Sequence, residues 1–421
     1  MNKSVQRHGK VDLTFAAPPS KSFTHRALIA GALASGKTTI FRPLDAEDTR
    51  LTATALRRLG AAIEEQPNRL IVTGCNGAFK DRGPTTLDLD NSGTSLRLLT
   101  TLALLCNNPV ILTGSARMQE RPIGPLAEAL PALGGTAEFE KQPGYPPLKV
   151  SGILRGGPVT IDGSVSSQFI SSILMAAPYA EQEVSVMIPS PPASASYLDI
   201  TLSVMEAFGA KVSRDGYERF AVSTKNRYTG RRYTIEGDYS SASYFFAIAA
   251  LCGGKVTVTK LVPDSVQGDR RFLDALALMG CTVTYGKDEA TVEGTGTLRG
   301  ITFDMSASPD TVQTLCMVAA RASTPTTITG ISHLKFKESD RINGTAERLR
   351  ALGGDVTVDD DSLTIHPAPI HGGIIDPEND HRTAMSFAVL GLAIGGIEIT
   401  GAECVNKSFP GFWDAMKGLI P

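Results

Sequence analysis

The amino-acid sequence predicts an α/β protein assembled from six repeated segments. Three observations support this fold class: a chain of 421 residues, a composition with 42 % hydrophobic and 20 % charged residues, and a small-residue helix pattern that recurs six times. One hydrophobic core rarely serves a chain this long, so two or more domains are expected. The composition excludes a disordered, collagen-like or coiled-coil chain.

The repeated segment has a constant order. A turn rich in Ser, Asp, Gly and Pro comes first, an apolar helix rich in Ala, Gly and Ser follows, and a β-rich run comes last. Successive segments start roughly 69 to 75 residues apart, longer than the common solenoid periods, so each should hold several helices and strands. The six segments begin at Pro18, Asp90, Asp162, Gly237, Ser306 and Asn379.

A second helix follows the β-rich run in most segments. Apolar residues at helical spacing and a glycine near the end mark it, as at 49–60, 270–280 and 344–354. Each unit therefore reads helix, strand, helix and further strands, and six units suggest two domains of three. We expect the small-residue helices inside each domain and the more polar second helices outside. An ordinary layered α/β sandwich is the alternative.

Charge and cysteine content exclude several classes of function. The 41 Lys and Arg residues nearly balance 43 Asp and Glu residues, so no general basic field exists for nucleic acid or an anionic membrane. The cysteines form no C-x-x-C pair, which argues against zinc ribbons and disulfide frameworks and favours a reducing compartment. The start of the chain has no apolar signal core, and 386–399 is too short and glycine-rich to span a bilayer, so we expect a cytoplasmic protein. The cysteines are Cys75, Cys106, Cys252, Cys281, Cys316 and Cys404.

One nucleotide-binding motif is misleading in its context. The segment 31–38, GALASGKT, matches the P-loop pattern G-x-x-x-x-G-K-[ST]. A P-loop follows a strand and opens a helix, whereas here the helix precedes the motif and a strand follows it. We therefore interpret Gly36 as a helix C-cap; saturable binding of ATP with Mg²⁺ would restore the P-loop interpretation.

Eight cations lie in or beside the repeat openings and connectors. Each one alone is typical of a solvated surface residue. Their joint position beside glycine-rich and helix-capping turns, in a nearly neutral protein, predicts a site for a small polyanionic molecule. The eight are Lys21, Arg26, Arg97, Arg121, Lys337, Arg341, Arg382 and Lys407.

Carboxylates accompany these cations at Asp310, Glu338, Asp340 and Asp380. Such a group is either an acid/base catalyst or half of a structural ion pair, and the residues by themselves favour neither. No H-E-x-x-H, C-x-x-C or clustered His/Asp set occurs, so we expect no metal.

Eight motifs in order connect the chain to a known family. It resembles the 5-enolpyruvylshikimate-3-phosphate synthase family, whose members join shikimate 3-phosphate to phosphoenolpyruvate. The motifs that carry the resemblance are NSGTSLR, RMQERPIGPL, GSVSSQFISSILMAAP, GDYSSASYF, PDTVQT, KESDRI, DHRTAMSF and KSFPGFW.

The resemblance implies a fold and an organisation. The fold would be an inside-out α/β barrel of two domains, each with three βαβαββ units. Residues 1–17 with 236–421 would form the first domain and 18–235 the second, with hinges near Ala17 and Glu236 and the active site in an interdomain cleft that closure assembles. The resemblance also implies a monomer that uses no cofactor and no metal, with small molecules as its only partners.

The resemblance further implies a mechanism. The 5-hydroxyl of shikimate 3-phosphate would attack C2 of phosphoenolpyruvate while the methylene carbon is protonated, and phosphate would leave the tetrahedral intermediate. Asp310 would take the hydroxyl proton, Glu338 would deliver and later remove the methylene proton, and Lys21 would bridge both substrates.

Binding residues follow from the same resemblance. Shikimate 3-phosphate would contact Lys21, Ser22, Arg26, Ser166, Ser167, Gln168, Ser194, Asp310 and Lys337. Phosphoenolpyruvate would contact Lys21, Gly93, Arg121, Gln168, Arg341, Arg382 and Lys407.

Some positions depart from the common family pattern. His333 stands where asparagine often contacts the shikimate phosphate, residues 23–25 read FTH instead of ISN, and Leu98 replaces a frequent proline. Gly93 matches the position where a larger side chain excludes glyphosate, so sensitivity to this inhibitor is expected.

Two other functions remain as alternatives. The sister enzyme that transfers enolpyruvyl to UDP-N-acetylglucosamine shares fold and donor, although GSVSSQF and KESDR favour shikimate phosphate. A non-catalytic anion-binding scaffold would need no carboxylates in its site, so Asp310 and Glu338 argue against it.

Overall fold

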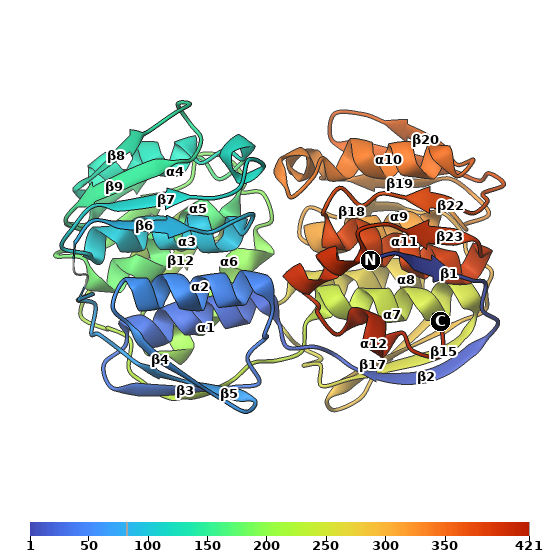
Figure 1. The fold of residues 1–421 in the computed structure, drawn as a ribbon, viewed down its shortest axis with the longest axis horizontal. Coiled ribbons are helices and arrows are strands. Elements are labelled where there is room, and N and C mark those ends of the chain that lie inside the picture. Colours follow the sequence, from blue (N-terminus) through green and yellow to red (C-terminus); the bar gives the residue numbers. More distant parts are fainter. Residues whose placement is uncertain (81–82, 421) are drawn as a thin grey trace. The chain divides into compact units, whose positions relative to one another are not determined.

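The computed structural model describes residues 1–80 and 83–420. The chain divides into two compact units (Figure 1). The first unit joins Met1–Pro19 to Glu236–Pro421, and the second unit is Ser20–Ile235. The family resemblance placed the two chain crossings near Ala17 and Glu236.

One repeat of the second unit shows the plan of the others. It runs β6 (Thr85–Asp88), α3 (Gly93–Leu102), β7 (Val110–Thr113), α4 (Gly124–Ala129), β8 (Gly135–Phe139) and β9 (Leu148–Gly152). Strands β6 and β7 are parallel, β9 pairs antiparallel with β7, and β8 pairs antiparallel with β9. This order is the βαβαββ unit that the resemblance predicted.

Two further repeats follow the same plan in full. In the second unit the repeat comprises β10 (Gly157–Thr160), α5 (Ser167–Ala176), β11 (Val184–Met187), α6 (Ser196–Ala207), β12 (Val212–Asp215) and β13 (Arg219–Val222). In the first unit it comprises β18 (Thr302–Asp304), α9 (Val312–Ala319), β19 (Thr326–Thr329), α10 (Arg341–Ala351), β20 (Asp355–Val358) and β21 (Ser362–His366). Each repeat forms its own four-stranded sheet.

Two repeats take their first strand from a distant part of the chain. Strand β14 (Arg232–Thr234) pairs parallel with β3 (Lys37–Phe41), and β2 (Val11–Ala16) pairs parallel with β15 (Gly254–Thr259). The remaining elements of these repeats are α1 (Lys21–Leu33), α2 (Glu47–Arg58), β4 (Ala62–Gln66), β5 (Arg69–Thr73), α7 (Tyr239–Cys252), α8 (Phe272–Leu278), β16 (Thr282–Tyr285) and β17 (Glu289–Gly294). In each unit, therefore, one sheet is completed by a strand from the end of a chain segment: β14 from the end of 20–235, and β2 from the end of 1–19.

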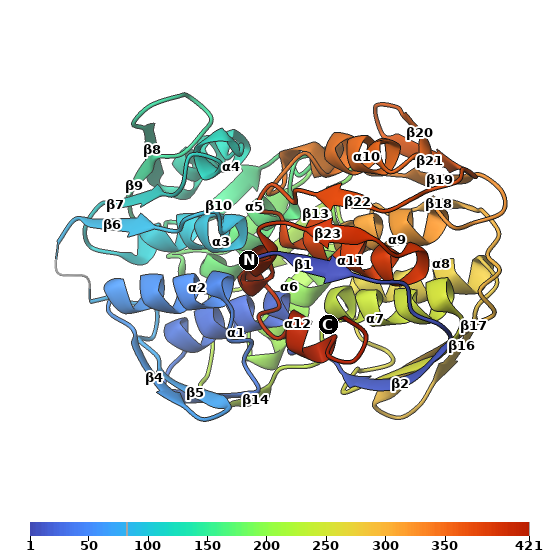
Figure 2. The same ribbon diagram turned by 45° about the vertical axis from the view of Figure 1, so that its right-hand side comes forward.

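The last repeat differs from the others. It consists of β22 (Gly373–Ile375), α11 (His381–Ile394) and β23 (Ile397–Ile399), and then continues into the 3-10 helix η8 (Ala402–Lys407) and α12 (Phe412–Ala415) instead of a hairpin. Strand β1 (Lys3–Val5) lies antiparallel along β23 and completes a three-stranded sheet (Figure 2).

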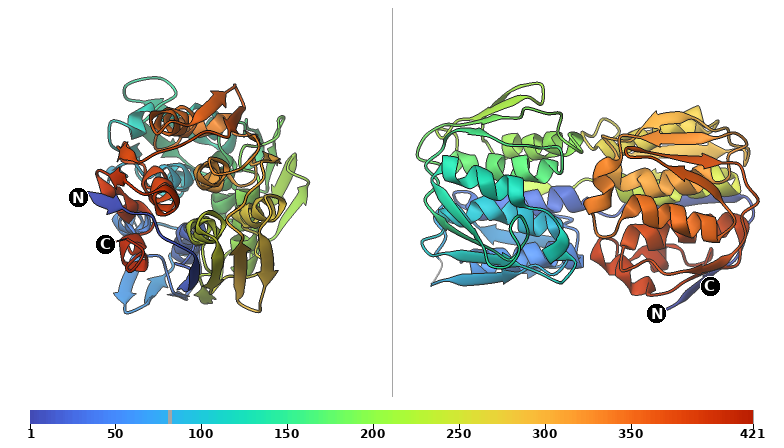
Figure 3. Two further views of the ribbon diagram at one scale, coloured as in Figure 1. Left: turned by 90° about the vertical axis from the view of Figure 1, so that its right-hand side faces the viewer. Right: turned by 90° about the horizontal axis from the view of Figure 1, so that it is seen from above.

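The small-residue helices lie inside each unit. In the first unit α7, α9 and α11 contact one another, and α7 is buried along all but its last residue, Cys252. Figure 3 shows the helices with strands around them. Alanine, serine and glycine side chains occupy little space, so such helices can pack closely and still bury all their faces. This arrangement confirms the inside-out fold expected above.

The P-loop motif spans the end of a helix, although the C-cap of α1 is Ala34 and not Gly36 as expected. Gly31 belongs to α1, Gly36 adopts a φ of 81°, and β3 begins at Lys37. The helix precedes the strand, which is the reverse of a P-loop. No helix among the described residues is long and apolar enough to cross a membrane.

Candidate active site

In the first unit, one buried guanidinium group binds three carboxylates. Arg341, the first residue of α10, donates from Nε to Asp380 Oδ2 (2.8 Å), from Nη2 to Glu338 Oε2 (2.9 Å) and from Nη1 to Asp310 Oδ1 (3.2 Å). Burial by itself lowers the pKa of Arg341, but the three carboxylates outweigh burial and raise it. The guanidinium group is therefore a permanent cation that fixes the two candidate acid/base residues.

A second guanidinium group contacts Asp310 from another helix. Arg382, near the start of α11, donates from Nη2 to Asp310 Oδ2 (2.6 Å) and from Nη1 to the Asp310 carbonyl (3.0 Å). Arg382 also donates to the hydroxyls of Ser240 and Tyr244, both on α7. Burial raises the pKa of Tyr244 to about 12, so its hydroxyl stays protonated. Asp310 thus lies between two cations.

Aspartate caps bring these residues to helix N-termini. Asp238 accepts from the Ser241 amide at the start of α7, Asp340 from the Ile342 amide at α10, and Asp380 from the Arg382 amide at α11. Capping leaves the remaining N–H groups and the positive end of the helix dipole available to an anion. Asp340 and Asp380 therefore have structural roles, and Asp380 also accepts from Ser339.

In the second unit, Arg121 lies directly against Gly93. Its Nη1 donates to both the carbonyl and the side-chain oxygen of Asn91 at 3.1 Å. A Cβ atom on Gly93 would lie 2.5 Å from Arg121 Nη2, which is closer than side chains tolerate. Glycine at position 93 therefore lets the guanidinium group rest on the first turn of α3.

Gln168 is positioned by the preceding repeat. Its Oε1 accepts from Arg97 Nη1 (3.0 Å) and its Nε2 donates to Thr94 Oγ1 (3.0 Å). Arg97 also donates to the Pro122 carbonyl, so this cation orients Gln168. Ser166, the buried N-cap of α5, accepts from the Gln168 amide.

Lys21 forms an ion pair that the sequence did not predict. Its Nζ lies 3.1 Å from Oδ2 of Asp48, a buried residue of α2. The only local signal for Asp48 was its place in the first turn of an expected helix, which is a common place for acidic residues. The pair orients the ammonium group of Lys21 at the start of α1.

Arg26 is more deeply buried than a ligand-binding cation was expected to be. The guanidinium group donates to Thr201 Oγ1 (2.7 Å), the Ser22 carbonyl (3.1 Å) and the Tyr197 carbonyl (3.3 Å). Burial lowers its pKa to about 10. Arg26 therefore also ties α1 to α6. Tyr197, at the start of α6, contributes a carbonyl acceptor that the sequence did not predict.

The remaining predicted residues lie at turns and helix ends. Ser194 is buried with a φ of 57°, and Lys407 is buried in η8. His333 is buried in the 3-10 helix η7 (Ser332–Phe336), where burial and the nearby Lys337 lower its pKa to about 3. Ser167 is buried and Lys337 half-buried. Among the residues that the structure describes, no group of three or more His, Cys, Asp or Glu side chains could hold a metal ion.

The fold and the anion-binding helix ends define a class of protein. The structure is similar to the enolpyruvyl transferase NikO from Streptomyces tendae, with a TM-score of 0.79 and 19 % identity over 100 % of this chain and 98 % of that one. It is also similar to an EPSP synthase from Acinetobacter baumannii, with a TM-score of 0.81 and 30 % identity over the same shares. The fold is thus that of the enolpyruvyl transferases.

Residues 5–416 match the family model of EPSP synthase (3-phosphoshikimate 1-carboxyvinyltransferase), and the chain belongs to this family. A 3-phosphoshikimate 1-carboxyvinyltransferase from Methanoculleus marisnigri is 63 % identical over 414 residues, 98 % of each chain. The protein of the same name from Methanoregula boonei is 64 % identical over 410 residues, 97 % of each chain.

Proposed function

We propose that this enzyme transfers the enolpyruvyl group of phosphoenolpyruvate to the 5-hydroxyl of shikimate 3-phosphate and releases phosphate. Family membership over nearly the whole chain supports the reaction. The observation that carries the residue assignment is the contact of Asp310 and Glu338 with one guanidinium group, that of Arg341.

The proposed reaction has two steps. In the first, Asp310 takes the proton of the 5-hydroxyl, the hydroxyl oxygen bonds to C2 of phosphoenolpyruvate, and Glu338 protonates the methylene carbon. In the second, the C2–O bond to phosphate breaks, phosphate leaves with the electron pair and takes up the proton held by Asp310, and Glu338 takes a proton back from the methyl group. Such proton transfers need two acid/base groups. Asp310, which contacts Arg341 and Arg382, and Glu338, which contacts Arg341, supply them.

Arg341 and Arg382 are the proposed ligands of the phosphoenolpyruvate anion, together with Lys407 of the same unit. Both guanidinium groups already bind Asp310. An incoming phosphate or carboxylate competes for the same N–H donors, so substrate binding loosens the hold on Asp310 and leaves that carboxylate available to the hydroxyl proton.

The second unit supplies the other proposed ligands. Ser166, Ser167 and Ser194 offer hydroxyl and backbone donors to the shikimate phosphate. Ser22, Arg26 and Gln168 would surround the ring, together with Lys337 of the first unit. Lys21, Gly93 and Arg121 would contact phosphoenolpyruvate. Because ligands for one substrate pair come from both units, neither unit alone should have activity.

The state of the protein is part of the proposal. We propose a cytoplasmic monomer that needs neither metal nor cofactor, which the near-neutral charge and the unpaired cysteine pattern support. Light scattering on the purified chain tests the monomer, and activity after treatment with a chelator tests metal independence.

The test of function is phosphate release from phosphoenolpyruvate, measured with shikimate 3-phosphate, with UDP-N-acetylglucosamine and without an acceptor. Release with shikimate 3-phosphate alone supports the proposal. Release only with UDP-N-acetylglucosamine would keep the chemistry and replace the acceptor. Absence of release with either acceptor would favour the anion-binding scaffold.

A further inference from the structure

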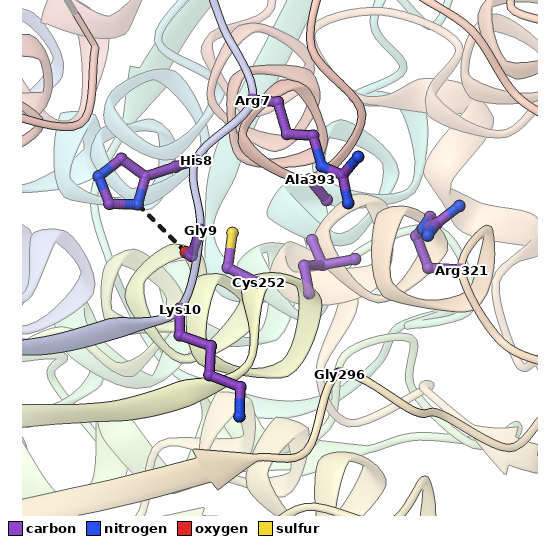
Figure 4. Close-up of a pocket in the computed structure, with 9 residues that line it drawn as sticks. Arg7, His8, Gly9, Lys10, Cys252, Gly296, Arg321 and Ala393 are labelled. Carbon is purple, nitrogen blue, oxygen red and sulfur yellow. Dashed lines mark hydrogen bonds between the residues drawn. The ribbon is translucent and has the colours of Figure 1, made fainter.

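The first unit contains a cationic pocket at the carboxyl end of its central helices. The pocket has a volume of about 530 Å³ (Figure 4). Its lining contains no Asp or Glu. The residues that matter for its chemistry are Arg7, His8, Lys10, Cys252 and Arg321.

The pocket is remote from the candidate active site. It lies where α7 ends at Cys252 and where α11 approaches its end at Ala393, whereas Ser240 and Arg382 stand at the beginnings of the same helices. A helix of this length spans about 21 Å at 1.5 Å per residue. The two sites are therefore separate.

Among the residues that the structure describes, the cations of the pocket have no anionic partner. Within the described parts of the chain, the side chains of Arg7, Lys10 and Arg321 form no hydrogen bond and no ion pair. Figure 4 shows their charged groups extended, while His8 bonds to the Gly9 carbonyl. Unpaired like charges around one concavity repel one another, and a bound anion would relieve that repulsion.

Stabilisation of helix ends is the competing explanation. Cations near a helix C-terminus interact favourably with the helix dipole. This protein has such a contact elsewhere: Arg299 donates to the carbonyl of Leu278, the last residue of α8, at 2.6 Å. Among the described residues, Arg7 and Arg321 make no comparable bond to a carbonyl, so any stabilisation of helix ends here acts through the dipole alone, and the experiments below distinguish it from anion binding.

We propose that this pocket binds a small molecule with two or more negative charges, either phosphorylated or polycarboxylic. Its volume lies within the roughly 300–1,000 Å³ range of small-molecule sites. The cations are solvent-exposed, so binding weakens as ionic strength rises. Nucleic acid would need a longer basic surface than three cations provide.

The first experiment is calorimetric titration of the full chain with pyrophosphate and, separately, with citrate. The test variant is Arg7→Ser/Arg321→Ser, and the matched control is Lys255→Ser/Lys287→Ser, which removes the same charge from exposed positions of the same unit outside the pocket. We expect the test variant to bind at least about tenfold more weakly at one site, since each charged hydrogen bond contributes substantially. The control should bind like the parent, and both variants should keep parental turnover and thermal unfolding.

The second experiment locates the bound anion. Cys252 lines the pocket, and Cys75 of the other unit is similarly half-buried. Alkylation by iodoacetamide, followed by peptide mass spectrometry, should show that pyrophosphate protects Cys252 and leaves Cys75 unchanged. The Arg7→Ser/Arg321→Ser variant should lose this protection.

The outcomes separate the possible ligands from the competing explanation. Binding of pyrophosphate without citrate assigns a phosphorylated ligand, and the reverse assigns a polycarboxylate. Equal binding by parent and test variant, or equal Cys252 labelling with and without pyrophosphate, overturns the proposal. Stabilisation of the helix ends would then be the role of these cations.

Discussion

At the scale of single residues, the site depends on contacts in which a large side chain fits because a neighbouring residue is small or closely placed. Arg121 can lie on the first turn of α3 only because position 93 has no side chain. Glu338 lies in the short turn between η7, which ends at Phe336, and α10, which begins at Arg341, so its carboxylate can pair with Arg341. Small local changes should therefore have specific effects on substrate binding.

We expect Gly93→Ala to weaken phosphoenolpyruvate binding and to reduce inhibition by glyphosate. The new methyl group would lie 2.5 Å from Arg121 Nη2 and must displace the guanidinium group. The KM for phosphoenolpyruvate and the glyphosate inhibition constant should both rise, by about tenfold or more. In Gly9→Ala, where a Cβ meets nothing within 4 Å, both constants should stay at the parental values. Unchanged constants in Gly93→Ala would refute a role for this contact.

Replacing Glu338 tests its assignment as the proton donor. Glu338→Gln should lower kcat by about 10²-fold to 10⁴-fold, because the amide cannot transfer the proton. Binding of shikimate 3-phosphate, measured by calorimetry, should persist. Glu347→Gln on the exposed side of α10 is the control and should retain activity. Parental turnover in Glu338→Gln would remove this residue from the mechanism.

His333 should make stability sensitive to acid. Burial, together with Lys337, lowers its pKa from 6.5 to about 3 in the folded state. Between these values the unfolded chain binds a proton that the folded chain does not, so stability falls as pH falls below about 6.5. At pH 5 the loss amounts to about 2 kcal/mol.

Urea unfolding at pH 5 and pH 7.5 measures this effect. The difference between the two pH values should be about 2 kcal/mol smaller in His333→Asn than in the parent. An equal difference in both proteins would mean that His333 titrates normally.

At the scale of elements, the aspartates that cap α10 and α11 differ in their burial and in the contacts they make. Asp340 caps α10 from a half-buried position, whereas Asp380 caps α11, is completely buried and also binds Arg341. Removing one partner of a buried ion pair leaves an uncompensated charge. The two caps should therefore differ in their contribution to stability.

Asp380→Ala should cost about 3–5 kcal/mol in the free energy of unfolding, and Asp340→Ala about 1 kcal/mol. Denaturant titration of the two variants beside the parent measures both values. Asp380→Asn should recover part of the loss, since the amide oxygen can still cap the helix. Equal losses in the two alanine variants would show that the Arg341 contact adds nothing to stability.

At the scale of the whole molecule, strand pairing between distant parts of the chain determines which segments contain all the strands of their sheets. The second unit contains β14, so all of its sheets are formed within 20–235. The segment 236–421 lacks both β1 and β2, which leaves the edges of β23 and β15 without their partners. Unpaired strand edges expose backbone donors and acceptors and favour aggregation.

We expect residues 20–235 expressed alone to unfold cooperatively on heating, and residues 236–421 alone to lack a cooperative transition. Addition of a peptide of residues 1–19 should restore a cooperative transition to the segment 236–421. Circular dichroism against temperature tests both segments. Cooperative unfolding of 236–421 without the peptide would contradict the role assigned to β2.

The sequence by itself determined the repeats, the helix starts and the motifs of the site. Helical periodicity and N-caps such as Asp238, Asp340 and Asp380 act within a few residues, so they can be identified without the rest of the chain. The motifs around Asp310 and Glu338 were visible for the same reason.

Only the tertiary structure decided which of those residues meet. The Lys21–Asp48 pair, the burial of Arg26 by Thr201 and the use of Arg97 to hold Gln168 join residues 27, 175 and 71 positions apart. The pairing of β14 with β3 and of β2 with β15 likewise joins distant parts of the chain. Such contacts follow from the packing of whole elements, because no local pattern specifies a partner that lies in another element.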